Sequence, residues 1–336
     1  MNVTIVGDGG WGTALGLLLR RQGHAVTIWG PFAGYLDEVR GARENIRFLP
    51  GIAIPPEIVW TADIVAATRG VDAFVLAVPS KFYADVCRRF AGAIGAHTPV
   101  ISVTKGLCAT THRRMSEIAA EILGNSNVAV LSGPSHAEEV ARGLPTAVVA
   151  AARDPRLAEQ VQRLFTGSRF RVYTSTDPIG VELGAAVKNV IAIAVGVSDG
   201  LGFGDNTRAA LITRGLAEMT RLACALGAQP ETLAGLSGVG DLIVTCTSRH
   251  SRNRGVGERL GRGEKIGSIL SGMQMVAEGV WNCRNVRALA REHGVEVPIT
   301  EQVYGLCYEG LDPQQALAAL MTRDSKPETT GLRPKK

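Results

Sequence analysis

The sequence has few aromatic residues and little lysine. Aromatic side chains make up 5% of the 336 residues, and no basic run alternates with them, which argues against a stacking surface for single-stranded nucleic acid. Only seven residues are lysine, so arginine carries nearly all of the positive charge, and the net charge of +5 also suits a small anionic ligand. A lysine within an apolar segment of this chain therefore stands out.

Other absences narrow the class of protein. The six cysteines form no Cys-x-x-Cys pair and adjoin no histidine cluster, which favours reduced thiols in a cytoplasmic protein and gives no metal site. The first residues lack a basic segment before an apolar one, and glycine or charge interrupts each long apolar segment. We therefore expect neither a secretion signal nor a membrane span.

The spacing of apolar residues divides the chain into two regions. Up to about residue 175, short apolar runs alternate with longer amphipathic segments, which is typical of a parallel sheet with crossover helices. Beyond Pro178 the apolar residues have helical spacing. The predicted fold class is α/β, with a Rossmann-type doubly wound parallel sheet over 1–177, an all-helical domain over 178–322 and a flexible tail over 323–336. The expected strands span 3–6, 25–29, 73–78, 100–103, 128–131 and 146–151, and the expected long helices span 180–197, 207–226, 279–293, 299–308 and 313–321.

A glycine-rich turn follows the first expected strand. Gly7, Gly9 and Gly12 have the spacing of a dinucleotide-binding turn between a strand and a helix. The first glycine permits the tight turn, the second lets the backbone approach a pyrophosphate, and the third allows the helix to pack closely on the strand. The helix N-terminus then offers N–H donors to the phosphates, so we expect NAD or NADP as the cofactor.

Two features of this region leave the choice of nucleotide open. Asp8 places a carboxylate where the pyrophosphate should come close, so it must point outward or meet a cation. The second strand ends at Trp29-Gly30-Pro31-Phe32. This turn has neither the acidic residue that commonly binds the adenosine ribose nor an arginine for a 2′-phosphate.

Two lysines are candidates for the chemistry. Lys105 ends an expected strand at the edge where doubly wound sheets bind ligands, and the turn 132–137, with a helix beginning near Ser135, follows another. Lys188 lies in the middle of a segment that is apolar nearly all round, which predicts a buried helix. A buried ammonium must have its pKa lowered, pair with a carboxylate or line a cavity. It would suit general acid and base catalysis of carbonyl reduction, and the alternative is a structural ion pair.

Two later segments carry further polar groups. Asp241 opens an apolar helix, where a carboxylate either caps the helix or pairs with Lys188. The segment 248–254 combines three arginines with serine and asparagine ahead of another helix, which suits a phosphate. A solvated basic loop or a nucleic-acid contact is the alternative there.

Together these motifs resemble the bacterial NAD(P)-dependent glycerol-3-phosphate dehydrogenases over about residues 2–322. The resemblance implies reversible reduction of dihydroxyacetone phosphate to sn-glycerol 3-phosphate, an oxidoreductase activity that supplies glycerophospholipid synthesis. Asp8 and Gly10 stand where similar proteins usually carry small residues such as alanine and serine, and Pro31-Phe32 replaces a polar or basic pair. The matching segments are 7–15, 104–107, 132–135, 187–192, 240–242, 245–247 and 251–253.

The resemblance also implies roles for individual residues. Lys188 is implied as the proton acceptor in the oxidative direction, with Lys105 and Asp241 beside the substrate. The implied substrate contacts are Lys105, Gly133, Ser135, Lys188, Asp241, Ser251, Arg252 and Asn253. The implied cofactor contacts are Gly7, Gly9, Gly10, Trp11, Gly12, Pro31, Phe48, Lys105, Ala137, Arg252, Val276 and Glu278.

Alternatives to this function stay open. A related dehydrogenase of 3-hydroxy acids would use the same fold with a carboxylate in place of the phosphate. A non-catalytic NAD(H) sensor would bind the cofactor without turnover, although it has no need of a buried Lys188. Nucleic-acid binding is disfavoured because the positive charge is dispersed and no DNA or RNA motif occurs. A homodimer, formed through an apolar helical face that the sequence does not locate, is an alternative to a monomer.

Overall fold

The computed structural model describes residues 1–273, 275–325 and 327–328. The chain forms two compact units: residues 1–108 with 113–178, and residues 109–112 with the chain from Ile179 onward. The change of unit comes at the beginning of a long helix, near the point where the sequence pattern changes. Positions 326 and 329–336 of the expected tail lie outside the described residues.

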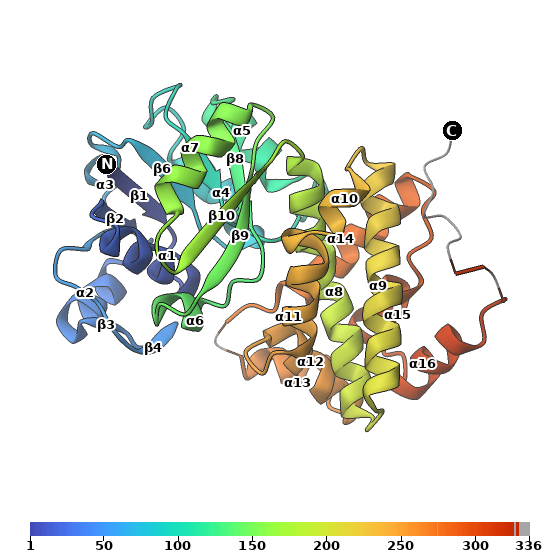
Figure 1. Ribbon diagram of the computed structural model, residues 1–336. Coiled ribbons are helices and arrows are strands. Elements are labelled where there is room, and N and C mark those ends of the chain that lie inside the picture. Colours follow the sequence, from blue (N-terminus) through green and yellow to red (C-terminus); the bar gives the residue numbers. More distant parts are fainter. Residues whose placement is uncertain (274, 326, 329–336) are drawn as a thin grey trace. The chain divides into compact units, whose positions relative to one another are not determined.

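The first unit is built on an eight-stranded sheet (Figure 1). Its strand order is β10-β9-β8-β7-β6-β1-β2-β5, in which β8 and β9 are antiparallel and the other neighbours are parallel. The predicted doubly wound class is confirmed, with this one antiparallel pair added. The strands are β1 (Asn2–Val6), β2 (Ala25–Trp29), β5 (Val59–Thr61), β6 (Ala73–Leu76), β7 (Val100–Ser102), β8 (Val128–Ser132), β9 (Thr146–Ala151) and β10 (Phe170–Ser175).

Helices cover both faces of this sheet because its central strands are apolar on both sides. In β1, Val3 and Ile5 join the core beneath α1 (Gly10–Arg21), α6 (Ala137–Ala141) and α7 (Pro155–Phe165). Val6 joins the opposite core, beneath α3 (Ile64–Thr68), α4 (Ser80–Arg89) and α5 (Met115–Leu123). Such two-sided burial is expected of parallel strands between helical layers. The carboxyl ends of these strands therefore form the free edge on which ligands bind in this fold.

A small hairpin adjoins the sheet beside α1. It consists of β3 (Glu44–Asn45) and β4 (Leu49–Ala53), and it follows α2 (Ala33–Ala42). Tyr35 and Phe48 pack edge to face, with ring centroids 5.5 Å apart. This contact fixes the hairpin against α2, close to the glycine turn described below.

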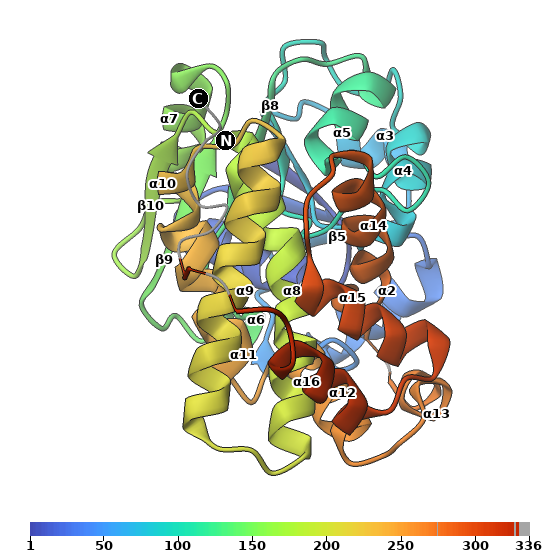
Figure 2. The ribbon, with the colours of Figure 1, turned by 90° about the vertical axis from the view of Figure 1, so that its right-hand side faces the viewer.

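The second unit is helical, as the sequence predicts. Its two longest helices, α8 (Pro178–Gly200) and α9 (Asp205–Ala225), run side by side and are joined by the short loop 201–204 (Figure 1, Figure 2). The remaining helices are α10 (Pro230–Leu233), α11 (Asp241–Thr247), α12 (Arg252–Gly261), α13 (Ile266–Ser271), α14 (Glu278–Glu292), α15 (Pro298–Tyr304) and α16 (Pro313–Met321), with π-helical turns η1 (Leu236–Gly240) and η2 (Gly305–Glu309).

Helix α8 is long and apolar enough to cross a membrane by length and composition alone. Within its most apolar 18-residue window, however, 89% of the residues are buried inside the protein. Such burial is typical of the central helix of a globular domain.

Glycines bring α8 and α12 into close backbone contact. A Cβ on Gly196 of α8 would lie 2.9 Å from the carbonyl carbon of Arg254, and a Cβ on Gly257 of α12 would lie 2.9 Å from that of Ile193. Side chains at these positions would force the helices apart. The contact sets the position of the N-terminus of α12 relative to the middle of α8.

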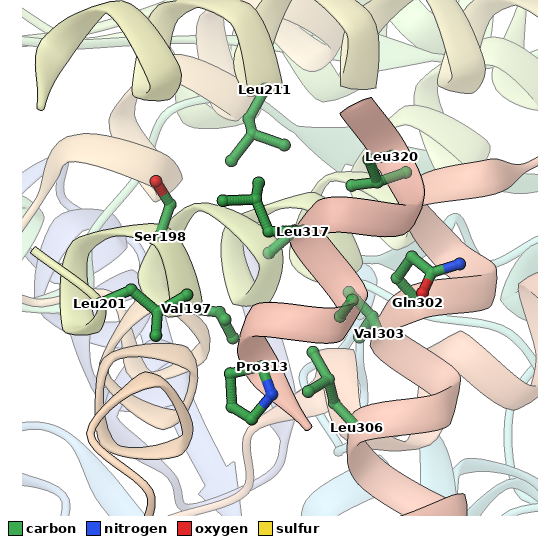
Figure 3. A pocket seen from close by; sticks show the side chains of 12 residues that line it. Val197, Ser198, Leu201, Leu211, Gln302, Val303, Leu306, Pro313, Leu317 and Leu320 are labelled. Carbon is green, nitrogen blue, oxygen red and sulfur yellow. The ribbon is translucent and has the colours of Figure 1, made fainter. Parts of the chain in front are cut away.

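Helix α16 closes an apolar pocket at one end of this unit (Figure 3). Leu317 and Leu320 of α16 face Leu306 of η2, Leu211 of α9 and Leu201, which follows α8. No charged side chain lines this pocket among the described residues. The side chains that line it are almost all apolar and pack on one another.

Candidate active site

The glycine turn joins β1 to α1 in the first unit. Gly7 has φ +124°, and a Cβ there would lie 2.6 Å from the carbonyl oxygen of Ala77. A Cβ on Gly12 would overlap the carbonyl group of Gly7. A Cβ on Gly9 would instead have no described atom within 4 Å. Only glycine fits at the first and third positions, while the backbone at Gly9 is open to a ligand.

The N-terminus of α1 offers the donors that a pyrophosphate requires. A Cβ on Gly10 would lie 2.5 Å from the carbonyl oxygen of Phe48 and 3.8 Å from Cβ of Ala137, so the hairpin and α6 both approach this end of the helix. The Nε1 of Trp11 is buried and donates to no atom of the described residues. An open backbone, a helix N-terminus and an unpaired indole donor together fit a dinucleotide.

Asn45, which no sequence motif marks, holds this turn in place. Its buried side chain donates from Nδ2 to the carbonyl oxygen of Asp8 at 2.8 Å and to Oγ1 of Thr13 at 2.7 Å. Its Oδ1 accepts from the hydroxyl of Tyr35 and from the backbone N–H of Phe48, the latter at 3.2 Å. Asn45 therefore connects the glycine turn, α1, α2 and the hairpin.

The Asp8 carboxylate lies against the end of β2. A Cβ on Gly30 would lie 2.7 Å from Cγ of Asp8. Oδ2 of Asp8 is buried and accepts no hydrogen bond from the described part of the chain. Burial raises the pKa of Asp8, and a hydrogen bond from the backbone of Asp8 itself and then the charge of Arg47 partly offset this. Asp8 as a whole is nevertheless partly exposed, so its side chain lies at the protein surface beside the end of β2.

Lys105 is gathered with two other predicted substrate residues of the same unit. It follows β7, and its Nζ donates to the carbonyl oxygen of Gly133 at 3.0 Å and lies 3.4 Å from Oγ of Ser135, both in the turn after β8. Gly133 has φ +142°, and a Cβ there would lie 2.9 Å from Cα of Val148. Helix α6 begins at Ala137, two residues after Ser135.

In the helical unit Lys188 is paired with Asp241. The Lys188 Nζ donates to Oδ1 of Asp241 at 2.6 Å and to Oγ1 of Thr245 at 2.7 Å. The Thr245 hydroxyl donates to the Asp241 carbonyl oxygen at 2.6 Å, which turns its lone pairs toward the ammonium. Of the alternatives for a buried lysine, the structure has the carboxylate partner. Asp241 does not cap α11, whose N-cap residue is Gly240.

The π-helical turn η1 places Asp241. It ends at Gly240, directly before α11, and a Cβ on Gly238 would overlap the backbone of Leu233. Because this backbone approach leaves no room for a Cβ, only glycine fits at position 238. Single π-helical turns of this kind are frequent at functional sites.

The predicted phosphate segment forms the N-terminus of α12. Ser251 is the N-cap residue, and its Oγ accepts from the backbone N–H of Arg254 at 3.2 Å. Asn253 is buried and donates from Nδ2 to Oδ1 of Asn189 at 2.9 Å, while its own Oδ1 accepts from the N–H of Gly279 at 2.8 Å. The segment is thereby attached to the residue after Lys188 and to the beginning of α14.

Arg252 lies at the same helix end and is exposed. Its NH1 donates to the carbonyl oxygen of Val276 at 2.7 Å, and Glu278 is the first residue of α14. The structure therefore brings the predicted residues 252, 276 and 278 into one neighbourhood.

Within the described ranges, no group of three or more His, Cys, Asp or Glu side chains could hold a metal ion.

Comparison with known proteins identifies the family. Residues 2–158 match the N-terminal domain, and residues 177–318 the C-terminal domain, of NAD-dependent glycerol-3-phosphate dehydrogenase. The chain belongs to the NAD-dependent glycerol-3-phosphate dehydrogenase family. The resemblance, the fold class, the dehydrogenase class and the NAD or NADP cofactor predicted from the motifs are thus confirmed.

Relatives of this family match over nearly the whole chain. The glycerol-3-phosphate dehydrogenase (NAD(P)+) of Geobacillus kaustophilus is 48% identical over 334 residues, covering 98% of this chain and 97% of that protein. The protein of the same name from Geobacter sulfurreducens is 50% identical over 329 residues, covering 97% and 98%. The crystal structure of glycerol-3-phosphate dehydrogenase from Coxiella burnetii has a TM-score of 0.92 at 43% identity, covering 96% and 99%.

In this member of the glycerol-3-phosphate dehydrogenase family, the predicted residues form two sets. The first unit holds the glycine turn with Phe48 and Ala137, and the cluster of Lys105. The helical unit holds Lys188 with its partners, and the N-terminus of α12 with its neighbours. Pro31 follows β2 beside Gly30 and is exposed. In the first unit the contacts given above join Gly10 to Phe48 and Ala137, and join Lys105 to Gly133 and Ser135. In the helical unit Asn189, the residue after Lys188, is joined to Asn253.

Proposed function

We propose that the chain interconverts dihydroxyacetone phosphate and sn-glycerol 3-phosphate with NAD(P)H, and so supplies glycerol 3-phosphate for glycerophospholipid synthesis. Matches to this family over nearly the whole chain support the reaction. The observation that carries the proposal is the Lys188 ammonium, held between Asp241 and Thr245 in a helix that is otherwise apolar. A side chain that holds a transferable proton at a fixed position is what carbonyl reduction requires.

Lys188 is assigned the proton transfer. The bound nicotinamide supplies the hydride chemistry. In reduction the Nζ of Lys188 gives its proton to the substrate oxygen, and in oxidation it accepts the proton of the secondary hydroxyl. Asp241 and Thr245 hold Nζ in place, while the charge of Lys105 polarises the same oxygen.

The remaining residues are assigned to binding. Arg252, Ser251 and Asn253 bind the substrate phosphate at the N-terminus of α12, where a guanidinium and backbone N–H groups suit an anion. The remaining substrate contacts are assigned to Lys105, Gly133, Ser135, Lys188 and Asp241. The cofactor contacts are assigned to Gly7, Gly9, Gly10, Trp11, Gly12, Pro31, Phe48, Lys105, Ala137, Arg252, Val276 and Glu278.

The proposal also covers the domains, the cellular location and the oligomeric state of the protein. Residues 1–177 form the dinucleotide-binding domain and 178–322 the substrate domain. The cysteines at all six positions are free thiols, which supports a cytoplasmic location. A homodimer remains an alternative to a monomer, and light scattering of the purified protein distinguishes the two.

The reaction is tested by the loss of absorbance at 340 nm when the protein and dihydroxyacetone phosphate are mixed with NADH or NADPH. A 3-oxo acid in place of the phosphorylated ketone tests the related dehydrogenase in the same assay. Oxidation with dihydroxyacetone phosphate but not with the 3-oxo acid supports the proposal. Binding of the nucleotides without oxidation by either substrate would overturn it in favour of a sensor.

A further inference from the structure

The end of β2 lacks the acidic residue with which dinucleotide-binding folds commonly bind the adenosine ribose. Trp29 is the last residue of β2, and Gly30-Pro31-Phe32 follow it. None of these side chains carries a charge. The family comparison likewise leaves both NAD and NADP as cofactors.

A carboxylate reaches this place from the neighbouring strand. β1 and β2 are parallel with Val6 opposite Trp29, and the N–H of Gly7 donates to the Trp29 carbonyl oxygen at 2.9 Å. The next residue, Asp8, therefore lies beside Gly30. A Cβ on Gly30 would lie 2.7 Å from Cγ and 2.9 Å from Cβ of Asp8. The missing side chain of Gly30 leaves the space that the Asp8 side chain fills.

One oxygen of the Asp8 carboxylate accepts no hydrogen bond from the described part of the protein. Oδ2 of Asp8 is buried and has no hydrogen-bond partner in the described ranges. Arg47, whose charge lowers the pKa of Asp8, stacks over the Tyr35 ring at 4.6 Å and forms no described ion pair with Asp8. Asn45 fixes the backbone of Asp8 through its carbonyl oxygen at 2.8 Å. The carboxylate is thus held in place with an acceptor oxygen left over.

We propose that Asp8 accepts hydrogen bonds from the adenosine ribose hydroxyls of NAD(H) and repels the 2′-phosphate of NADP(H), and so determines the choice of cofactor. A ribose offers two neighbouring O–H donors, which match the two oxygens of a carboxylate. A 2′-phosphate removes one donor and places a charge of about −2 beside the carboxylate. The inference rests on the proposed function and names which of its two cofactors the chain uses.

The test measures binding by titration calorimetry with ADP-ribose and with ADP-ribose carrying a 2′-phosphate. These probes contain the adenosine half of each cofactor but no nicotinamide, and no substrate is present. The full chain is compared with Asp8→Ala and Asp8→Asn. Asp85→Ala is the matched control, because Asp85 is an aspartate of the same unit whose side chain is 78% exposed.

The unmodified chain is expected to bind ADP-ribose at least about tenfold more tightly than its 2′-phosphate form. Asp8→Ala should weaken ADP-ribose binding about ten- to a hundredfold, the range for hydrogen bonds to a charged group, without weakening the phosphorylated probe. Asp8→Asn, which keeps one acceptor oxygen, should fall between, and Asp85→Ala should leave the ratio unchanged.

Two results would overturn the inference. One is equal or tighter binding of the phosphorylated probe by the unmodified chain, which would assign Arg47 to the 2′-phosphate. The other is an unchanged ratio of the two affinities in both Asp8 variants. If Asp8→Ala does not fold, Asp8→Asn decides alone. Failure of dihydroxyacetone phosphate reduction would count against the proposed function and would leave these binding results intact.

Discussion

Lys188 and Asp241 form a buried ion pair, in which 2.6 Å separates Nζ from Oδ1 and the side chains are 5% and 1% exposed. Neither charge is tolerated in such surroundings without the other, because removing one partner leaves an uncompensated charge out of water. The proton that the proposed reaction needs is therefore held by a contact on which the fold of the helical unit also depends.

Replacing Lys188 with alanine should affect turnover and stability together. We expect kcat to fall at least about 10²-fold, since the proton donor is lost. The free energy of unfolding should fall by about 3–5 kcal/mol, because Asp241 is left buried and unpaired. Steady-state kinetics at saturating substrate and urea unfolding measure the two effects.

The double variant Lys188→Ala with Asp241→Ala separates chemistry from structure. It should regain part of the lost stability, since no lone charge remains, but none of the turnover. Turnover close to that of the unmodified chain in the single variant would show that Lys188 is not the acid. A double variant no more stable than the single one would show that the pair is not coupled.

Arg252→Ala should act mainly on substrate binding. Loss of a charged contact to phosphate is expected to raise KM for dihydroxyacetone phosphate at least about tenfold, with a smaller effect on kcat. Arg249→Ala is the control, because Arg249 is an exposed arginine of the same basic segment. Equal KM values in the two variants would place the phosphate elsewhere.

Asn45→Ala should loosen the nucleotide site without touching the reacting groups. Its amide is the common partner of the glycine turn, α1, α2 and the hairpin, so we expect a loss of about 2–3 kcal/mol in stability, as for several buried hydrogen bonds removed together. The Kd for ADP-ribose should rise, while kcat at saturating NADH should change little. Asn127→Ala, which removes a hydrogen bond at an exposed site, should do neither.

Most of the sheet follows from the sequence because its central strands are continuous apolar runs. The sequence pattern misses strands of this sheet that are short or that alternate between buried and exposed residues. β10 alternates buried and exposed residues at the sheet edge, and β5 has only three residues. In the helical unit, the region 235–263 is rich in glycine, which weakens a helical pattern. Two of its glycines, Gly257 and Gly261, lie where α12 touches α8 through the backbones of both helices.

The candidate site follows from the sequence where motifs are local. The glycine turn and the position of Lys188 within an apolar helix are of this kind. Asn45 is not, because two of its hydrogen-bond partners lie 32 and 37 residues away along the chain. Lys188 and Asp241 are 53 residues apart along the chain. From the sequence, their pairing is therefore only one of several alternatives.

Gly257→Ala tests the backbone contact that positions α12. The new Cβ would lie 2.9 Å from the carbonyl carbon of Ile193 and from the backbone nitrogen of Val197, so α8 and α12 must separate. We expect a loss of about 1–3 kcal/mol on urea unfolding, as for an overpacked core. Gly255→Ala, on the same helix with no described atom within 4 Å of its Cβ, should instead stabilise by up to about 1 kcal/mol. Equal effects of the two substitutions would contradict the packing argument.

Asp8→Asn should change how stability depends on pH in the absence of nucleotide. Burial raises the pKa of Asp8 above its ordinary value of 3.8, so folding favours the protonated acid. The contribution of Asp8 to stability is therefore complete below the pKa of the unfolded chain and is lost as pH rises through the higher folded pKa. The asparagine variant does not ionise, so it should be the more stable protein at pH 7, and its advantage should shrink as pH falls toward 4.

Urea midpoints measured from pH 4 to pH 7 test this prediction, with Asp85→Asn as the control for removing one exposed carboxylate. Saturating ADP-ribose should reverse the order at pH 7, because the ligand supplies the hydroxyl donors that the ionised Asp8 lacks in the protein alone. An advantage of Asp8→Asn that persists unchanged at pH 4 would mean that the amide stabilises the turn by its own hydrogen bonds. The order at pH 7 with and without ADP-ribose then shows whether the ionised carboxylate is kept for the ligand.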